Sequence, residues 1–112
     1  MLEGAVDSQF GIGNQTWDST GFRGYDAGAN LKSMSGWFGG GTDLFGFSGL
    51  AGGFRSYGGF FTYLGDYGYW WSSMEYGISD ARTNGLIATF SEAYRFESSK
   101  KSGFNIRCLR DN

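Results

Sequence analysis

The chain has 112 residues, a formal net charge of −2 and a pI near 4.9. It forms one domain by length, and its mildly acidic balance excludes the basic surface that nucleic acids require. No apolar run approaches the roughly 20 residues of a membrane-spanning helix. Aromatic residues make up 20% of the chain, and there are 21 glycines. Disordered segments are poor in aromatics, so we expect a folded chain in which rings supply apolar area and glycines supply turns.

Residues 1–36 are predicted to be loop-rich, with short helical turns. Residues 2–6 fit the last turn of a helix, and residues 27–33 fit another short helical turn. Between them a long ordered loop, residues 7–30, is expected to be pinned by three rings: Trp17, Phe22 and Tyr25. The N-terminus has no basic region followed by an apolar stretch, so no signal peptide is predicted.

Residues 37–112 are predicted to form the sheet. The candidate strands are residues 52–57, 60–64, 67–74, 81–88, 93–97 and 103–110. The strongest candidate, residues 67–74, places Tyr69 and Trp71 on one face and Trp70 on the other, which favours the centre of the sheet. Asn84-Gly85 is a hairpin signal that competes with a turn at residues 89–92, and we favour the second. The fold class expected is a β-dominated α+β domain with short antiparallel strands and long ordered loops.

The residue inventory argues against an enzyme. Without histidine there are no histidine-dependent triads, and a single cysteine excludes thiolate clusters. Cys108 shares one face of its extended segment with Phe104 and Ile106, which predicts a small buried hydrophobe. Four acids lie near predicted strand ends, and their spacing singles out no catalytic pair: Asp43, Asp66, Glu75 and Asp80. No cofactor is predicted. Calcium binding is kept as an alternative because calcium needs only oxygen ligands, although no EF-hand loop is present.

The positive signal is a composition typical of binding surfaces. Residues 70–96 mix Tyr and Trp with Ser, Asn and Gly, as paratopes do. Tyr69, Trp70 and Trp71 are expected in the core. The candidate ligand-binding residues are Tyr76, Asp80, Arg82, Asn84 and Tyr94. The ligand expected is a glycan or a protein, and the alternative is a structural domain that self-associates. The most basic stretch, residues 95–110, is interpreted as a solvated strand and loop because Glu97 interrupts it.

A series of motifs spans nearly the whole chain. They are Asp26-Ala-Gly-Ala-Asn-Leu-Lys-Ser33, Ser35-Gly-Trp37, Gly41-Thr-Asp43, Gly46-Phe-Ser48, Gly52-Gly-Phe-Arg55, Gly68-Tyr-Trp-Trp-Ser-Ser73, Glu75-Tyr76 and Gly103-Phe-Asn-Ile-Arg-Cys-Leu-Arg-Asp111. Taken together, this series resembles the Fibrobacter succinogenes major paralogous domain. The resemblance implies a C-type-lectin-like fold and an exported or surface-attached bacterial protein, often a lipoprotein. It transfers no catalytic residue.

The chain departs from the family pattern at two positions. Ala51 stands where the family usually has proline, and Arg82 stands where it usually has tryptophan. Family members also begin further upstream, so the chain resembles the C-terminal part of such a domain, with any signal on a longer parent chain. A strand that pairs with residues 104–109 is then expected to be missing, which would leave an edge open to self-association.

Overall fold

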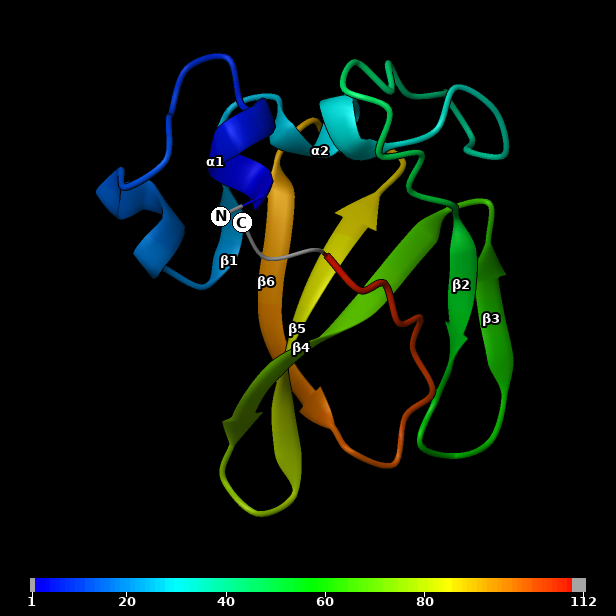
Figure 1. Cartoon of the computed structure of the whole chain (residues 1–112). Coiled ribbons are helices and arrows are strands. Elements are labelled where there is room, and N and C mark those ends of the chain that lie inside the picture. The colour runs from blue at the N-terminus through cyan, green and yellow to red at the C-terminus, as the bar shows by residue number, and fades with distance from the viewer. Residues whose placement is uncertain (1, 110–112) are drawn as a thin grey trace.

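Six strands form one mixed sheet in the computed structural model, which describes residues 2–109 (Figure 1). In chain order the elements are α1 (Leu2–Val6), the 3-10 helix η1 (Gln15–Asp18), β1 (Gly21–Arg23), α2 (Ala27–Leu31), β2 (Gly52–Arg55), β3 (Phe61–Leu64), β4 (Tyr67–Tyr76), β5 (Asp80–Ile87) and β6 (Ala93–Ser99). The strands lie in the order β1-β6-β5-β4-β2-β3. All neighbours are antiparallel except β2 and β4, which are parallel. The predicted β-dominated architecture with short helical pieces is confirmed.

The long strand β4 lies near the middle of the sheet, between β5 and β2, as its sequence predicted. Its side chains alternate between the two faces. Tyr69 is buried, at 8% exposure, whereas Trp70 and Trp71 are half-buried. Trp70 packs at the edge of the core cluster on one face, and Trp71 contacts Phe104 on the other.

A bulge divides β4 before its hairpin with β5. Trp71 pairs with Thr83 and Glu75 pairs with Ala81, so residues 72–74 lie opposite Arg82 alone. The Ser72 hydroxyl donates a hydrogen bond to the Arg82 carbonyl at 3.0 Å, which holds the extra residues against β5. The chain turns between β5 and β6 at residues 88–92, close to the favoured 89–92 prediction, and Asn84-Gly85 lies inside β5.

Residues 103–105 lie inside the sheet, between β2 and β4. Strand β2 meets β4 only at the pair Gly53↔Gly68, and Gly53 takes a φ of 62° that disfavours a side chain. Residues 103–105 then occupy the space between the diverging strands. Gly103 exchanges backbone hydrogen bonds of 2.8 and 2.7 Å with Arg55. The Asn105 N–H donates to the Tyr69 carbonyl at 2.9 Å, and its carbonyl accepts from the Trp71 N–H at 3.2 Å.

Three predictions about this segment are wrong. Residues 103–109 form isolated bridges and no strand, while Arg110 lies outside the described residues. The segment is not an unpaired edge, because it hydrogen-bonds to β2 on one side and β4 on the other. Cys108 is exposed and Ile106 is 78% exposed, since the chain leaves the sheet after Asn105 and its side chains lose their alternation.

The predicted loop of residues 7–30 is organised by a carboxylate. Trp17 is buried at 1% exposure, as expected, but Phe22 and Tyr25 are 42% and 57% exposed and do not pin the loop. Instead, the two oxygens of Asp7 accept five backbone N–H groups, at distances of 2.7 to 3.1 Å: those of Gln9, Phe10, Tyr25, Asp26 and Ala27. This network ties α1 to α2 across η1 and β1, two elements that the sequence did not predict.

The two helices lie together at one end of the sheet (Figure 1). The buried residues that join them to the sheet are Val6, Trp17, Ala27, Leu31, Trp37, Ala51, Leu86 and Ala93. Leu86 on β5 and Ala93 on β6 belong to this cluster, so their face of the sheet is the covered one. No helix among the described residues is long and apolar enough to cross a membrane.

Candidate functional site

The five predicted ligand-binding residues lie on both faces of the sheet. Asn84 pairs with Trp70 on one side and with Arg95 on the other, so these three side chains share the covered face. Arg82 and Asp80 follow on the same face by alternation along β5. Tyr94 precedes Arg95 on β6 and therefore points to the opposite face. The predicted set is not one continuous surface.

Tyr76 and Arg82 form a pair near the tip of the β4–β5 hairpin. The Arg82 guanidinium carbon lies 4.9 Å from the Tyr76 ring centroid, and the guanidinium pairs with Glu97 at 2.5 Å. Asp80 lies opposite Tyr76 at the last pair of the hairpin. Arg82 is thus held by a ring and a carboxylate, which accommodates its charge at this position.

The open face of the sheet carries a continuous set of aromatic rings, which we call the aromatic face. Its members are Phe22, Phe54, Tyr63, Tyr67, Tyr69, Trp71, Phe90, Tyr94, Phe96 and Phe104. The contacts run without a break from β1 through β6 and β4 to β2 and β3. Phe104, from the segment between β2 and β4, packs against the central rings Tyr69 and Trp71 at 5.4 and 4.4 Å.

Neighbouring rings on the aromatic face stack on one another. The centroids of Phe22 and Phe90 are 4.2 Å apart at 25°, and those of Tyr63 and Tyr67 are 4.4 Å apart at 18°. Tyr94 and Phe96 stack at 4.8 Å. At such distances and angles the ring planes face each other, so each ring covers part of its neighbour's face.

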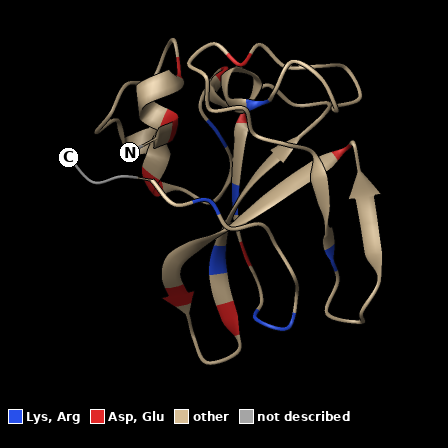
Figure 2. Cartoon of the chain, turned by 45° about the vertical axis from the view of Figure 1, so that its right-hand side comes forward, with Lys and Arg blue, Asp and Glu red and all other residues tan. Residues whose placement is uncertain are grey.

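Exposure increases from the middle of the aromatic face to its ends. Tyr69 is buried, and this burial, together with the neighbouring Tyr67, Tyr94, Tyr63 and Asp66, raises the pKa of its hydroxyl well above the ordinary 10. Phe22 and Phe90 at one end are about 40% exposed, at 42% and 40%, and Tyr63 at the other end is 48% exposed. The β2–β3 hairpin beside Tyr63 carries a single charged residue, Arg55 (Figure 2). The Tyr63 end of this face therefore offers apolar contact area with little charge.

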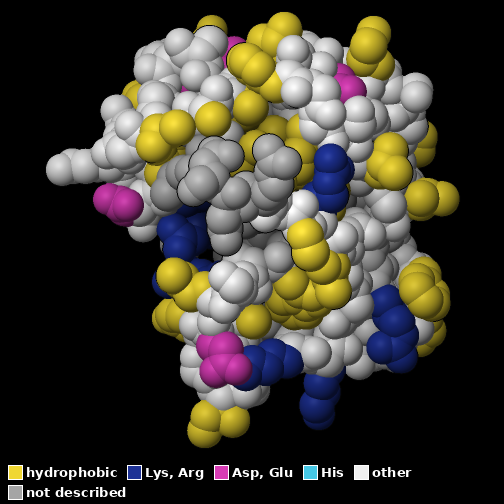
Figure 3. Space-filling model, viewed as in Figure 1, with side chains coloured by type: hydrophobic (Ala, Val, Ile, Leu, Met, Phe, Trp, Pro, Cys, Tyr) yellow, Lys and Arg dark blue, Asp and Glu magenta, His cyan; other side chains and the backbone are white. Residues whose placement is uncertain are grey.

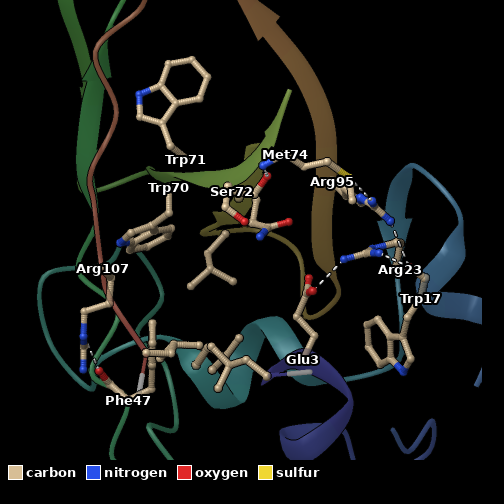
Figure 4. Close-up of a pocket in the computed structure, with 17 residues that line it drawn as sticks. Glu3, Trp17, Arg23, Phe47, Trp70, Trp71, Ser72, Met74, Arg95 and Arg107 are labelled. Carbon is tan, nitrogen blue, oxygen red and sulfur yellow. Dashed lines mark hydrogen bonds and ion pairs between the residues drawn. The ribbon is translucent and has the colours of Figure 1, made fainter. Parts of the chain in front are cut away.

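The covered face contains a cavity of about 340 Å³ (Figure 4). Trp70 and Phe47 line it on one side, and Glu3, Arg23 and Arg95 line it on the other, while Trp71 points away from the middle of the cavity. Figure 3 shows the molecule in the view of Figure 1. On this side hydrophobic side chains and Lys and Arg side chains are interspersed.

The basic residues of the cavity come from distant parts of the sequence. Arg23 lies on β1, Arg95 on β6, and Arg107 in the segment that follows Asn105. Sequence reasoning missed Arg23 because its strand was taken for a loop. Arg95 and Arg107 belong to the basic stretch that was interpreted as solvated, and only the fold brings them to one cavity.

The acids considered as catalytic or calcium-binding groups have separate local roles. The Asp43 carboxylate accepts hydrogen bonds from the Ser48 N–H at 2.7 Å and the Ser48 hydroxyl at 2.6 Å; these bonds lower its pKa. Glu75 pairs with Lys100 at 3.1 Å. Within residues 2–109, no three acidic or cysteine side chains lie close enough together to hold a metal ion.

The fold and these two surfaces define a small α+β domain built on a mixed six-stranded sheet, with an open aromatic face and an arginine-lined cavity. The chain belongs to the family of the Fibrobacter succinogenes major domain, whose family model matches residues 5–110. This match confirms the family resemblance carried by the sequence motifs. Neither the curated proteins nor the solved structures contain a match to this chain.

Proposed function

We propose that this domain is a non-catalytic recognition module that binds a protein partner through the aromatic face. The observation that carries the proposal is the unbroken set of stacked rings on the face that the helices leave open. Aromatic residues dominate binding energy at protein interfaces because each buries a large rigid area. A half-exposed array of them on one sheet face is a rare feature for a surface without a partner.

The ring geometry favours a protein over a glycan. Sugars bind aromatic residues by lying flat on a free ring face. Here Phe22 and Tyr94 each have two neighbouring rings at 4.2 to 4.8 Å, and Tyr63 has one at 4.4 Å, so neighbouring rings occupy much of the ring faces. Positive ring edges and tyrosine hydroxyls complement carbonyl oxygens and the π faces of a partner's aromatic side chains.

Self-association through a sheet edge is the weaker alternative. The outer strand β3 is short, and Tyr63 within it takes a φ of 61°, which interrupts the regular extended backbone that edge pairing needs. The segment of residues 103–105, expected as an open edge, is already bonded on both sides. Neither β3 nor residues 103–105 therefore favour pairing with a second copy of the chain.

Selection from a displayed library of random peptides, run in parallel with a glycan array, tests the proposal. We expect apolar and aromatic peptides to be selected, and the variants Phe22→Asn and Tyr94→Asn to weaken their binding about tenfold or more. Tyr76→Asn is the matched control, since Tyr76 is 51% exposed and lies on the other face. Equal loss in the Tyr76 variant would refute the assignment of the surface.

Two other outcomes identify the competing functions. Glycans bound by the wild type and lost in the Phe22 and Tyr94 variants would make the module a lectin. Sedimentation coefficients that rise with concentration, and fall back in the same two variants, would make the aromatic face a homo-oligomer contact.

We further propose that the domain has a C-type-lectin-like fold and is displayed outside the cell, as part of an exported bacterial protein or lipoprotein. Two short helices beside a mixed sheet, with the long connection of residues 32–51, support the fold assignment. An experimental structure tests the fold. Antibody labelling of intact cells that express the parent protein tests the location; labelling only after lysis would contradict it.

A further inference from the structure

The cavity on the covered face lies between the sheet, helix α1 and the segment that carries Arg107 (Figure 4). Its volume of about 340 Å³ falls within the range of small-molecule sites. It lies on the opposite side of the sheet from the aromatic face, so what it binds is independent of the function proposed above.

One side of the cavity is apolar. The Trp70 ring projects into it from β4 and meets Phe47 edge to face at 6.5 Å. Leu31 of α2 and Leu86 of β5, both buried, close this side. These surfaces suit the hydrocarbon or aromatic body of a small molecule.

The other side of the cavity is positively charged. Arg23 is 3% exposed and pairs with Glu3 at 2.6 Å, which balances one charge. Its Nε is buried and has no hydrogen-bond partner. Within residues 2–109 Arg95 has no carboxylate at ion-pair distance. Arg107 has none either, but it lies on the apolar side of the cavity, beside Phe47.

The guanidinium of Arg95 lines the cavity with incomplete hydrogen bonding. One of its nitrogens donates to the Trp17 carbonyl at 3.2 Å, and the other reaches only the Met74 sulfur at 3.8 Å, a weak acceptor. Partial burial and the like charges of Arg23 and Arg82 lower the pKa of Arg95 below its ordinary value. A negative charge placed here would offset both effects.

We propose that the cavity binds a small monocarboxylate with an apolar or aromatic body. The carboxylate accepts hydrogen bonds from Arg95 beside the buried Nε of Arg23, and the apolar body lies against Trp70, Leu31 and Leu86. A guanidinium fork matches a carboxylate in geometry and charge. The Glu3 carboxylate limits the site to a single negative charge, because it repels a more highly charged group.

Titration with three isosteric probes tests the charge requirement: 3-phenylpropionate, 3-phenylpropan-1-ol and 3-phenylpropylamine. We expect 3-phenylpropionate to bind at least ten times more tightly than the alcohol, and the amine not to bind. In two-dimensional NMR spectra the indole N–H of Trp70 and the Nε–H groups of Arg95 and Arg23 should shift with the acid. Equal affinity for the acid and the alcohol, shifts confined to other residues, or no binding of any probe would overturn the proposal.

Two variants locate the site. Arg95→Met keeps the length of the side chain without its charge and should lower the affinity for 3-phenylpropionate at least tenfold. Arg55→Met is the matched control, because Arg55 is exposed on β2 and does not line the cavity. Should Arg95→Met fail to fold, Ser73→Trp places a ring at an exposed position of the lining and should abolish binding. Unchanged affinity in either cavity variant would contradict the assignment.

Discussion

The ring of Tyr69 lies directly over the backbone of Gly85 on the neighbouring strand. A methyl group built on Gly85 would come within 2.8 Å of the Tyr69 Cδ1 and Cε1 atoms. Gly85 pairs with Tyr69 in the register of β4 and β5, so the absence of a side chain on one strand makes room for the central ring on the other. The aromatic face is built around this pair.

Replacing Gly85 with alanine should therefore destabilise the domain. The Tyr69 ring cannot move aside easily, because Phe54, Phe96 and Phe104 surround it at 4.8 to 5.4 Å. We expect the free energy of unfolding to fall by about 1–3 kcal/mol, measured by urea denaturation. Gly11→Ala is the control, since a Cβ there meets nothing within 4 Å, and it should leave stability unchanged or slightly raised. Equal effects of the two substitutions would contradict the packing argument.

The two arginine–carboxylate pairs should differ in their contribution to stability. Arg23 and Glu3 are 3% and 13% exposed, whereas Arg82 and Glu97 are 21% and 28% exposed. Glu3→Ala leaves a buried guanidinium without its anion and should cost about 3 kcal/mol or more. Glu97→Ala should cost about 1 kcal/mol or less, because water can reach Arg82. Thermal and chemical unfolding of both variants compare the two values; a larger loss in the Glu97 variant would be the contrary result.

Asp7 should make stability depend on pH in the acid range. Burial raises the pKa of its carboxyl, but the backbone N–H groups of Phe10, Tyr25, Gln9 and Asp26 together lower it further, so the net pKa lies below the ordinary 3.8. A lowered folded pKa means that this contribution is complete above pH 3.8 and is lost as the pH falls through the folded value. Asp7→Asn should cost about 2 kcal/mol near neutral pH.

The difference in unfolding free energy between wild type and Asp7→Asn should narrow once the pH drops below 3.8. Denaturation curves collected from neutral to strongly acidic pH measure it. A constant difference over that range would mean that the carboxylate charge contributes nothing to the network.

Phe104 and Ile106 lie two residues apart and should respond very differently to truncation. The ring of Phe104 contacts Phe54, Tyr69, Trp71 and Phe96, so Phe104→Ala should cost about 2–4 kcal/mol. Ile106 is 78% exposed, and Ile106→Ala should change stability by less than about 0.5 kcal/mol. Hydrogen exchange of the Trp71 and Asn105 amides should accelerate in the first variant alone.

Cys108 should react as an exposed thiol in the folded protein. We expect a thiol reagent to modify it at nearly the same rate with and without denaturant, because its side chain is exposed. Protection of the thiol under native conditions would contradict the position of the segment after Asn105.

The sequence predicted the positions of most strands but not how the segments of the chain pair with one another. Residues 67–74 and 93–97 are rich in aromatic side chains, which favour strands, and both fall within observed strands. Asp7 and residues 103–105 were misjudged because their roles depend on partners far away in the sequence. No local pattern reveals that one carboxylate will accept N–H groups 18 to 20 residues away, or that a segment will enter a gap between diverging strands.

The sequence indicated the residue types of the candidate site but not which of those residues share a face of the sheet. Of the three rings expected in the core, Tyr69 is buried at 8% exposure, whereas Trp70 and Trp71 are half-buried, so that prediction is confirmed for Tyr69 alone. Tyr94 lies on the opposite face of the sheet from Arg82 and Asn84, and this difference depends on the register of β5 against β6, which the sequence does not reveal. The cavity arginines could not be grouped at all without that register.

The position of residues 103–105 governs the order in which the sheet can close during synthesis. The β2–β3 hairpin pairs with β4 at a single pair of glycines, and further backbone hydrogen bonds between β2 and β4 run through a segment made some fifty residues later. While the chain is still attached to the ribosome, the hairpin can form locally but cannot be fixed in place. A nascent chain arrested before Gly103 should therefore bind chaperones through the unsecured rings of β2 and β3, whereas one released after Asn105 has cleared the exit tunnel should not.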